Sequence, residues 1–162
     1  MARLCKLALF ILLFQPLTAA LADSLAGQPS AQALPVQPLT IVTMSGASLQ
    51  FQVEIATREK DQARGLMYRK TMAPDAGMLF LWEGERPISM WMKNTYLSLD
   101  MLFINAQGVV VHIAPRTTPL SEEIIDSKQP VSGVLELLAG TAAASGIAVG
   151  SRVIHPHFGT TP

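Results

Sequence analysis

The segment Trp91-Met92-Lys93-Asn94-Thr95 brings together the side chains best suited to bind a small molecule. In a strand, alternate residues share a face, so Trp91 and Lys93 would lie together, opposite the methionines beside them. An indole next to an ammonium and an amide can stack on a ring and hydrogen-bond its edge. This predicts a site for a polar ligand with a flat or anionic part. The alternative is a strand end with Trp91 in the core, Lys93 in solvent, and Asn94 and Thr95 in a turn.

Two arginines, Arg64 and Arg69, flank a turn that begins at Gly65. A guanidinium binds a carboxylate or phosphate with two parallel hydrogen bonds. If the turn brings both arginines to one side, they could clamp an anion together with Lys93 or Arg116. The competing expectation is that at least one of them forms an internal ion pair.

Asp100 and Glu136 are the acids expected to meet such arginines, because each lies in an apolar stretch where a carboxylate is rarely left unpaired. They are therefore structural ion-pair candidates. If one of them instead sits in the ligand site with a raised pKa, it could act as an acid or base in a reaction. The sequence leaves the partners of both acids open.

Six methionines lie between residues 67 and 101: Met67, Met72, Met78, Met90, Met92 and Met101. Thioethers bind Cu(I), but methionine also fills gaps in apolar cores. Several of these methionines lie in strand-like apolar runs, which favours core packing over copper. Of the histidines, His112 is expected in a core or at a sheet edge, and His155 and His157 are only a weak metal signal.

Signatures of a known catalytic site are absent from the sequence. There is no G-x-S-x-G, no phosphate-binding glycine loop and no H-E-x-x-H, so the catalytic residues stay unknown. Cys5 is the only cysteine. It lies in the N-terminal segment described below, so the mature chain offers no disulfide, thiol nucleophile or thiolate ligand, and no metal or cofactor is expected.

Short strands with few helices must position these residues. Alternation predicts a half-buried strand over 49–56, and Thr57 and Gly65 bound a short helix over 58–64. The segment 83–87 is predicted to form a turn and 114–130 a surface loop. Further strands are predicted over 77–82, 88–92, 100–104, 109–113, 131–138 and 152–155, and a second short helix over 139–145. The fold class is mainly β: a compact antiparallel β-sandwich or partly closed barrel.

The N-terminus has the pattern of a secretory signal peptide. Arg3 and Lys6 precede an apolar run over 7–14, and Ala20-Leu21-Ala22 fits a cleavage site. We expect cleavage after Ala22 and a periplasmic or secreted protein with no transmembrane span. Residues 23–38 are rich in Ala, Gln, Ser and Pro and are predicted to be a flexible linker. A single β-rich domain over 39–158 and a tail over 159–162 would follow.

The charge balance argues against nucleic acid as a partner. The chain has 12 basic and 12 acidic residues. Signal cleavage would remove two of the basic ones, leaving ten against 12 and a formal charge of −2. Such a chain lacks the basic surface that DNA or RNA requires.

The order and spacing of five phrases resemble a bacterial and archaeal family, domain of unknown function 192. The phrases are Gly65-Leu66-Met67-Tyr68-Arg69, Gly77-Met78-Leu79-Phe80, Ser89-Met90-Trp91-Met92-Lys93-Asn94-Thr95, Leu99-Asp100-Met101-Leu102-Phe103-Ile104 and Val134-Leu135-Glu136-Leu137. The resemblance spans roughly Gln50 to Val153, and the signal peptide would make this chain an exported member. It implies a compact β-fold and names no reaction.

The function expected from these residues is binding of a small polar or anionic metabolite by an exported domain. The ligand-binding candidates are Arg64, Arg69, Trp91, Lys93, Asn94 and Thr95. One alternative is an envelope protein-interaction domain that uses the loop 114–130. The other is an enzyme of unknown reaction that uses Asp100 or Glu136.

Overall fold

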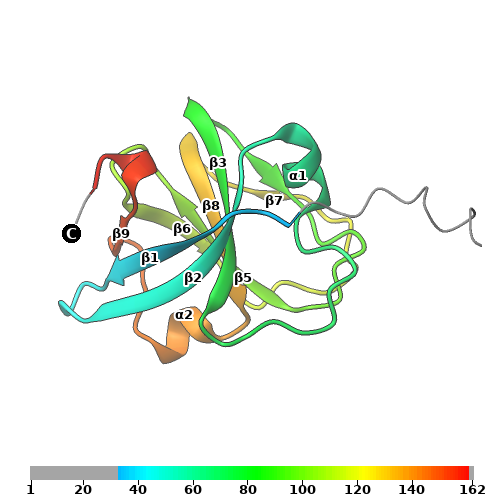
Figure 1. Ribbon diagram of the computed structural model, residues 1–162, viewed down its shortest axis with the longest axis horizontal. Coiled ribbons are helices and arrows are strands. Elements are labelled where there is room, and N and C mark those ends of the chain that lie inside the picture. Colours follow the sequence, from blue (N-terminus) through cyan, green and yellow to red (C-terminus); the bar gives the residue numbers. More distant parts are fainter. Residues whose placement is uncertain (1–32, 161–162) are drawn as a thin grey trace, which may run out of the picture. The chain divides into compact units, whose positions relative to one another are not determined.

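A seven-stranded sheet that curls into a half-barrel forms the frame of the molecule (Figure 1). The computed structural model describes residues 33–160. The order of strands in the large sheet is β6-β5-β8-β3-β2-β1-β9, and β4 and β7 form a separate two-stranded sheet. The prediction of a mainly β, partly closed barrel with two short helices is confirmed.

The elements have the following bounds. The strands are β1 Val36–Val42, β2 Ser48–Ala56, β3 Ala76–Arg86, β4 Ser89–Met90, β5 Leu99–Ile104, β6 Val110–Ala114, β7 Ile125–Asp126, β8 Val131–Leu138 and β9 Arg152–Ile154. The helices are α1 Glu59–Arg64 and α2 Thr141–Ala144, and a 3-10 turn, η1, spans Pro156–Phe158.

One pair of neighbours in the large sheet is parallel. β2 and β3 run in the same direction, and every other neighbouring pair in that sheet is antiparallel. A parallel pair needs a long crossover rather than a hairpin. The chain makes this crossover through α1 and the turn after Gly65, which places that segment on the outer face of the sheet.

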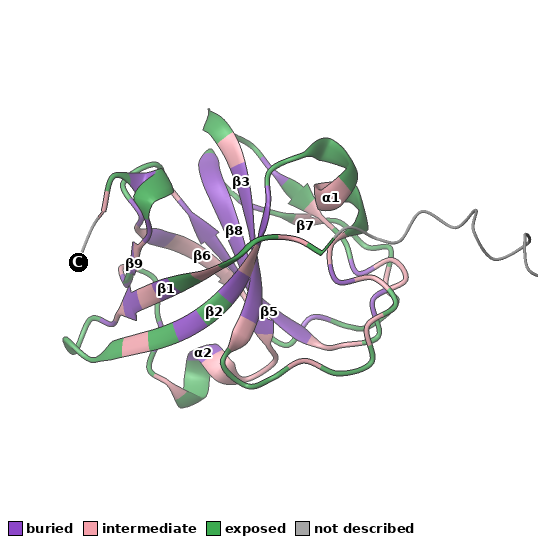
Figure 2. Ribbon diagram, in the orientation of Figure 1, coloured by how far each residue is buried: buried purple, intermediate pink, exposed green. Residues whose placement is uncertain are grey.

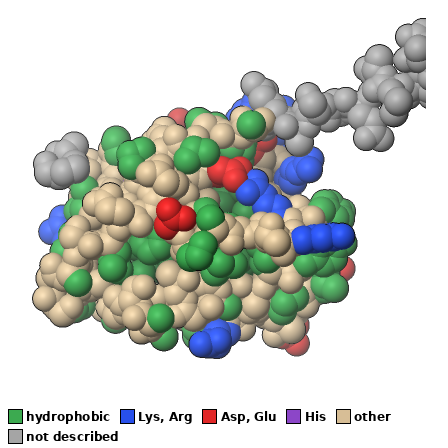
Figure 3. Space-filling view, turned by 60° about the horizontal axis from the view of Figure 1, so that its bottom comes forward, with side chains coloured by type: hydrophobic (Ala, Val, Ile, Leu, Met, Phe, Trp, Pro, Cys, Tyr) green, Lys and Arg blue, Asp and Glu red, His purple; other side chains and the backbone are tan. Residues whose placement is uncertain are grey.

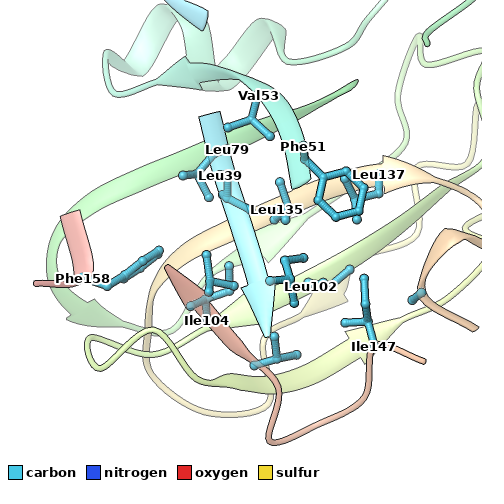
Figure 4. Close-up of a cluster of buried hydrophobic side chains, with 14 of the residues drawn as sticks. Leu39, Phe51, Val53, Leu79, Leu102, Ile104, Leu135, Leu137, Ile147 and Phe158 are labelled. Carbon is cyan, nitrogen blue, oxygen red and sulfur yellow. The ribbon is translucent and has the colours of Figure 1, made fainter. Parts of the chain in front are cut away.

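The inside of the half-barrel is the larger apolar core. Alternate residues of β2, β3, β5 and β8 point into it, and Phe158 of η1 packs against it from the C-terminal side (Figure 4). The exposed or half-exposed Gln50, Gln52 and Glu54 of β2 face the other way, as the alternation predicts.

The outer face of the same sheet carries a second apolar core. Met78, Phe80, Met101, Phe103 and Val134 lie in it. Segments between the strands cover this face, so every residue of β5 is buried and so is all of β8 except its last residue (Figure 2). β5 and β8 are thus buried on both faces, which is unusual for antiparallel strands.

Several predicted boundaries need correction. β1 begins at Val36, so residues 36–38 belong to the sheet and not to a linker. β3 continues through the predicted turn at 83–87 as far as Arg86 by means of a register shift. The strand predicted over 88–92 is reduced to β4, and its partner β7 lies within the predicted loop 114–130. The N-cap residue of helix α1 is Arg58 and not Thr57.

The two ends of the large sheet meet at the turn before β6. Val109 forms an isolated bridge with Arg152 of β9. Gly108 lies beside it at a φ of 77°, and its carbonyl oxygen accepts a hydrogen bond of 2.7 Å from the amide of Val153. A β-carbon added at Gly108 would lie 2.6 Å from the Val153 carbonyl oxygen. Glycine is therefore required here for both conformation and space.

Gly108→Ala is expected to destabilise the protein more than Gly46→Ala. Both glycines have a positive φ, of 77° and 84°, but nothing lies within 4 Å of a β-carbon at Gly46. Backbone strain should cost both variants about 1 kcal/mol, and the clash should add roughly 1–3 kcal/mol at Gly108. Urea unfolding of both variants measures the difference. Equal losses would show that the contact between the sheet ends contributes nothing.

Candidate ligand-binding site

A cavity of about 290 Å³ lies on the outer face of the sheet. Its lining comes from four parts of the chain that are distant in sequence: α1 with the turn that follows it, β3, β8, and the segment from β4 to Thr95. The crossover between β2 and β3 supplies one wall and the short sheet supplies another.

Glu136 of β8 is the innermost polar residue of this cavity. Only 4% of its surface is exposed, and Oε2 has no hydrogen-bond partner among the described residues. Its neighbours on the adjacent strands are Met78 and Met101, which are both fully buried. Removal from water disfavours the charged form, and burial raises the pKa of Glu136 to about 8. The side chain is therefore mostly neutral at pH 7.

Aromatic rings of β3 lie next to Glu136 in the lining. Phe80 and Trp82 alternate with inward-facing Leu81, and their rings stack with centroids 6.4 Å apart and planes 15° apart. The guanidinium of Arg86 lies 5.7 Å from the centre of the Trp82 ring. This part of the cavity therefore offers an apolar surface with a face that attracts positive charge.

Helix α1 and the turn after it form one wall. Gln62 fastens the helix to the sheet by donating to the carbonyl oxygens of Leu81, at 2.8 Å, and Ala56, at 3.3 Å. Gly65 ends the helix at a φ of 47°, and a β-carbon there would lie 3.2 Å from the Phe80 ring. Arg64 and Glu59 are exposed and bring the charged groups of α1 to the cavity.

The opposite wall contains Trp91. Its side chain is 44% exposed, so it does not pack in the core. The ammonium of Lys93 lies 5.2 Å from the centre of the Trp91 ring and 3.6 Å from a carboxylate oxygen of Glu122. The Ser89 hydroxyl donates to Asp126 at 2.7 Å, which ties β4 to β7. This wall is therefore formed by the Trp91 indole, which directly follows β4, the strand that the Ser89–Asp126 hydrogen bond joins to β7.

Three of the six predicted ligand-binding residues line the cavity. They are Arg64, Trp91 and Thr95. Lys93 is not in the lining and instead covers the Trp91 ring. Asn94 has a φ of 54° and accepts a hydrogen bond from the amide of Tyr68 through its carbonyl oxygen, so it shapes a turn.

Arg69, the remaining candidate, forms an internal ion pair. Its two terminal nitrogens donate to both carboxylate oxygens of Glu54, the second at 2.6 Å. The hydrogen bond to Glu54 raises the pKa of Arg69. The expected internal pairing of an arginine is therefore present, but its partner is Glu54 of β2 and not Asp100 or Glu136.

Asp100 is held by backbone amides and not by an arginine. Its two carboxylate oxygens accept hydrogen bonds from the amides of Arg116, at 2.8 Å, and Ala142, at 2.9 Å. Asp100 pairs with Leu137 in the sheet while Met101 pairs with Glu136, so the two acids point to opposite faces. Only Glu136 lines the cavity, and neither acid forms an ion pair in the described part of the chain.

Four residues of the cavity lining were not predicted from the sequence: Phe80, Trp82, Gln62 and Glu59. Alternation within the predicted strand 77–82 places Phe80 and Trp82 on one face and could have grouped them. No comparable signal exists for Gln62 and Glu59, because their position depends on how α1 crosses the sheet.

Copper and metal sites find little support among the described residues. Met78, Met92 and Met101 are buried in the outer core, as expected for gap-filling side chains. Residues 33–160 contain no group of three or more His, Cys, Asp or Glu side chains placed to hold a metal ion.

No helix in this range has the length and apolarity to cross a membrane.

His112 and His155 each contact a side chain of the large sheet. His112 lies on the outermost strand β6 and stacks on Phe103 with ring centres 5.3 Å apart. Burial, followed by the charge of Lys128, lowers the pKa of His112. His155 is buried and hydrogen-bonds Gln37 of β1 at 2.9 Å through Nε2. Burial, with a smaller contribution from His157, lowers its pKa as well.

Comparison with known proteins places the chain among proteins of similar sequence and fold. The model of the DUF192 family, described as "Uncharacterized ACR", matches residues 40–155. A crystal structure of a proposed transcription regulator from Sinorhizobium meliloti 1021 is 45% identical, with a TM-score of 0.76, and the match covers 77% of this chain and 97% of that one. A protein of unknown function from Novosphingobium aromaticivorans DSM 12444 is 32% identical, with a TM-score of 0.74, over 80% and 94% of the two chains. No curated protein matches the chain.

Glu136→Gln is expected to remove a pH dependence of stability. In the wild type, the folded pKa of about 8 lies above the value of 4.5 for a free glutamate, so the folded state holds the proton more tightly. The free energy of unfolding should therefore fall by about 1 kcal/mol per pH unit between roughly pH 5 and 8. Glutamine keeps the shape without the charge, so the variant should gain on the wild type as pH rises.

Urea unfolding of both proteins at pH 5, 6, 7 and 8 measures this effect. Asp126→Asn serves as a control, because Asp126 is an exposed acid whose substitution should leave the slope in place. Parallel pH profiles for the wild type and Glu136→Gln would contradict the buried, neutral carboxyl.

Proposed function

The chain belongs to the DUF192 family, and from the geometry of its cavity we propose that it binds a small polar or anionic metabolite over Glu136. One observation carries this proposal: a buried carboxyl group with an unpartnered oxygen lies in an aromatic-lined cavity. Buried polar groups are nearly always hydrogen-bonded, and the exceptions concentrate at functional sites. A ligand hydroxyl, amide or amine would supply the missing partner.

The aromatic surfaces indicate the apolar part of the ligand. Trp82 and Trp91 both line the cavity, and Trp91 is partly exposed. Indole faces stack on flat or ring-shaped groups, and such contacts add about 0.5–1.5 kcal/mol beyond the burial of area. A ring with polar substituents, such as a sugar derivative, therefore matches the lining.

The size of the cavity limits the ligand. Pockets for drug-sized molecules span roughly 300–1,000 Å³, and this one measures about 290 Å³. The ligand is thus a small metabolite with few ring atoms. An anionic part of it would be held by Arg64, the one arginine or lysine in the lining, which lies at the exposed side.

Catalysis with Glu136 as a general acid is a second candidate function. A carboxyl group that stays neutral at pH 7 because its pKa is about 8 can donate a proton to a bound substrate. Asp100, the other acid expected in this role, lies on the opposite face. If Glu136→Gln abolished turnover of a substrate but still bound it, the result would favour catalysis by Glu136 over binding alone.

The charge of this chain does not support DNA binding, although the Sinorhizobium meliloti protein is described as a transcription regulator. The 12 basic residues are balanced by 12 acidic ones. The face drawn in Figure 3 carries scattered acidic and basic side chains with no continuous basic area. A basic surface is the usual requirement for binding a phosphate backbone.

We also propose that the protein is exported and that its N-terminal segment is cleaved off after Ala22. This segment lies outside the described residues. The apolar run and the Ala-Leu-Ala sequence support this proposal. Expression of the whole gene product in a bacterium should give a periplasmic protein that begins at Asp23, as determined by intact mass and N-terminal sequencing. An intact Met1 form in the cytoplasm would contradict export.

The ligand class can be found with a thermal-shift screen of sugars, nucleotides, carboxylic acids and amines against the whole protein. A ligand at 100 times its dissociation constant adds about 2.7 kcal/mol to the free energy of unfolding. For any compound that raises the melting temperature, Trp91→Ala should weaken binding about tenfold, because the stacking surface is lost.

Arg69→Met is the matched control. Arg69 lies outside the cavity lining and is paired with Glu54, so its loss should leave affinity unchanged even if stability falls. Isothermal titration of the three proteins compares them directly. Equal weakening by both substitutions, or none by Trp91→Ala, would place the ligand elsewhere.

A further inference from the structure

We propose that the ligand of this cavity carries a primary ammonium group, which donates a hydrogen bond to Oε2 of Glu136 and forms an ion pair with it. This inference rests on the proposed function and specifies the charge of the group that reaches the innermost part of the site. An anionic part elsewhere in the same molecule is compatible with it, since Arg64 lies at the exposed side.

Residues 33–160 supply no cation that pairs with Glu136. The residues opposite it on the neighbouring strands are Met78 and Met101. The three ion pairs of the described chain join other residues, and they include Arg69 with Glu54 and Lys93 with Glu122. A buried carboxylate is stable only beside a positive charge or several donors. When Glu136 is ionised, a counterion for it must therefore come from the cavity.

The other charged groups of the lining also favour a cationic ligand. Among the lining residues, α1 contributes Glu59 and Arg64, and the wall from β4 to Thr95 contributes no ionisable side chain. β3 contributes only aromatic rings, and β8 contributes Glu136. With Glu136 ionised, two carboxylates face one guanidinium, and that guanidinium is exposed to solvent. Coulomb attraction is strongest for the buried group, where water screens least.

Both tryptophans of the cavity already lie beside cations. The Arg86 guanidinium lies 5.7 Å from the centre of Trp82, and the Lys93 ammonium lies 5.2 Å from the centre of Trp91. Neither cation belongs to the lining. Indole faces are the strongest aromatic partners of positive charge. Both rings therefore already act as partners of positive charge in this protein.

A primary ammonium fits better than a quaternary one. The unpartnered atom is a carboxylate oxygen, which needs a hydrogen-bond donor, and a quaternary nitrogen has no N–H. The proton balance follows from the chemistry. Free protein holds a neutral Glu136 at pH 7, so binding of R–NH₃⁺ releases the carboxyl proton to the buffer and leaves a carboxylate–ammonium pair.

Benzylamine, benzyl alcohol and benzoate test this inference, because they share a ring and differ in charge. Isothermal titration of the whole protein at pH 7 should give an affinity for benzylamine at least tenfold higher than for the other two. Titration in phosphate and in HEPES, which differ in ionisation enthalpy and contain no primary amine, should report close to one proton released per benzylamine bound. Between pH 6 and 7 the affinity should rise about tenfold, since only the ionised carboxyl binds.

Two variants identify the group responsible. Glu136→Gln should lose the preference for benzylamine, the proton release and the pH dependence, while its melting curve at pH 7 confirms that it is folded. Glu59→Gln removes the other carboxylate of the lining and should retain the proton release and the pH dependence. Loss of the effect in Glu59→Gln alone would move the ammonium to the rim and overturn the assignment to Glu136.

Failure of this inference can be separated from failure of the proposed function. Tighter binding of benzoate or benzyl alcohol, or benzylamine binding without proton release, would overturn the ammonium assignment and leave a ligand site in place. The same conclusion would follow if none of the three probes bound but a sugar or nucleotide did so in a Trp91-dependent way. If no compound of the thermal-shift screen bound either, both proposals would fail.

Discussion

Burial of the central strands on both faces is the constraint on which the rest of the structure depends. β8 lies between β3 and β5, and all its residues except Leu138 are buried. Its alternate side chains enter two separate cores, one inside the half-barrel and one on the outer face. An antiparallel sheet normally leaves one face to water, so this sheet requires a second layer of chain to cover it.

The covering layer contains little regular structure and is fastened by individual hydrogen bonds. The amide of Met92 donates to Ser121 at 3.0 Å, and the amide of Thr117 donates to Leu99 at 2.8 Å. On the opposite face of the sheet, Asp100 accepts two further hydrogen bonds, from the amides of Arg116 and Ala142. Its burial is therefore satisfied by backbone donors. A layer built in this way can leave a cavity between itself and the rigid sheet, and the candidate site lies in that interface.

Glu136 is also buried, but it lacks the hydrogen-bond donors that compensate the burial of Asp100 among the described residues. It is as deeply placed as Asp100, but Oε2 has no donor or counterion among the described residues. Its burial costs stability, and that cost is tolerated in proteins mainly where a site needs it. The contrast between two acids on neighbouring strands separates the structural role of Asp100 from the ligand-binding role that we propose for Glu136. Asp100 holds the backbone at Arg116 and Ala142, and Glu136 faces a cavity lined by aromatic rings.

The sequence by itself determined the fold class and much of the strand order along the chain. Alternation located β2, and apolar runs located β5 and β8, because burial of side chains sets a period that neighbouring residues already reveal. Of the six ligand-binding candidates chosen from the sequence, three line the cavity, namely Arg64, Trp91 and Thr95. Only the tertiary structure decided that Arg69 pairs with Glu54, that Asp100 and Glu136 face opposite sides, and that α1 brings Gln62 to the cavity. These outcomes depend on strand pairing and on one crossover between distant segments, and local residue patterns carry no record of which segments meet.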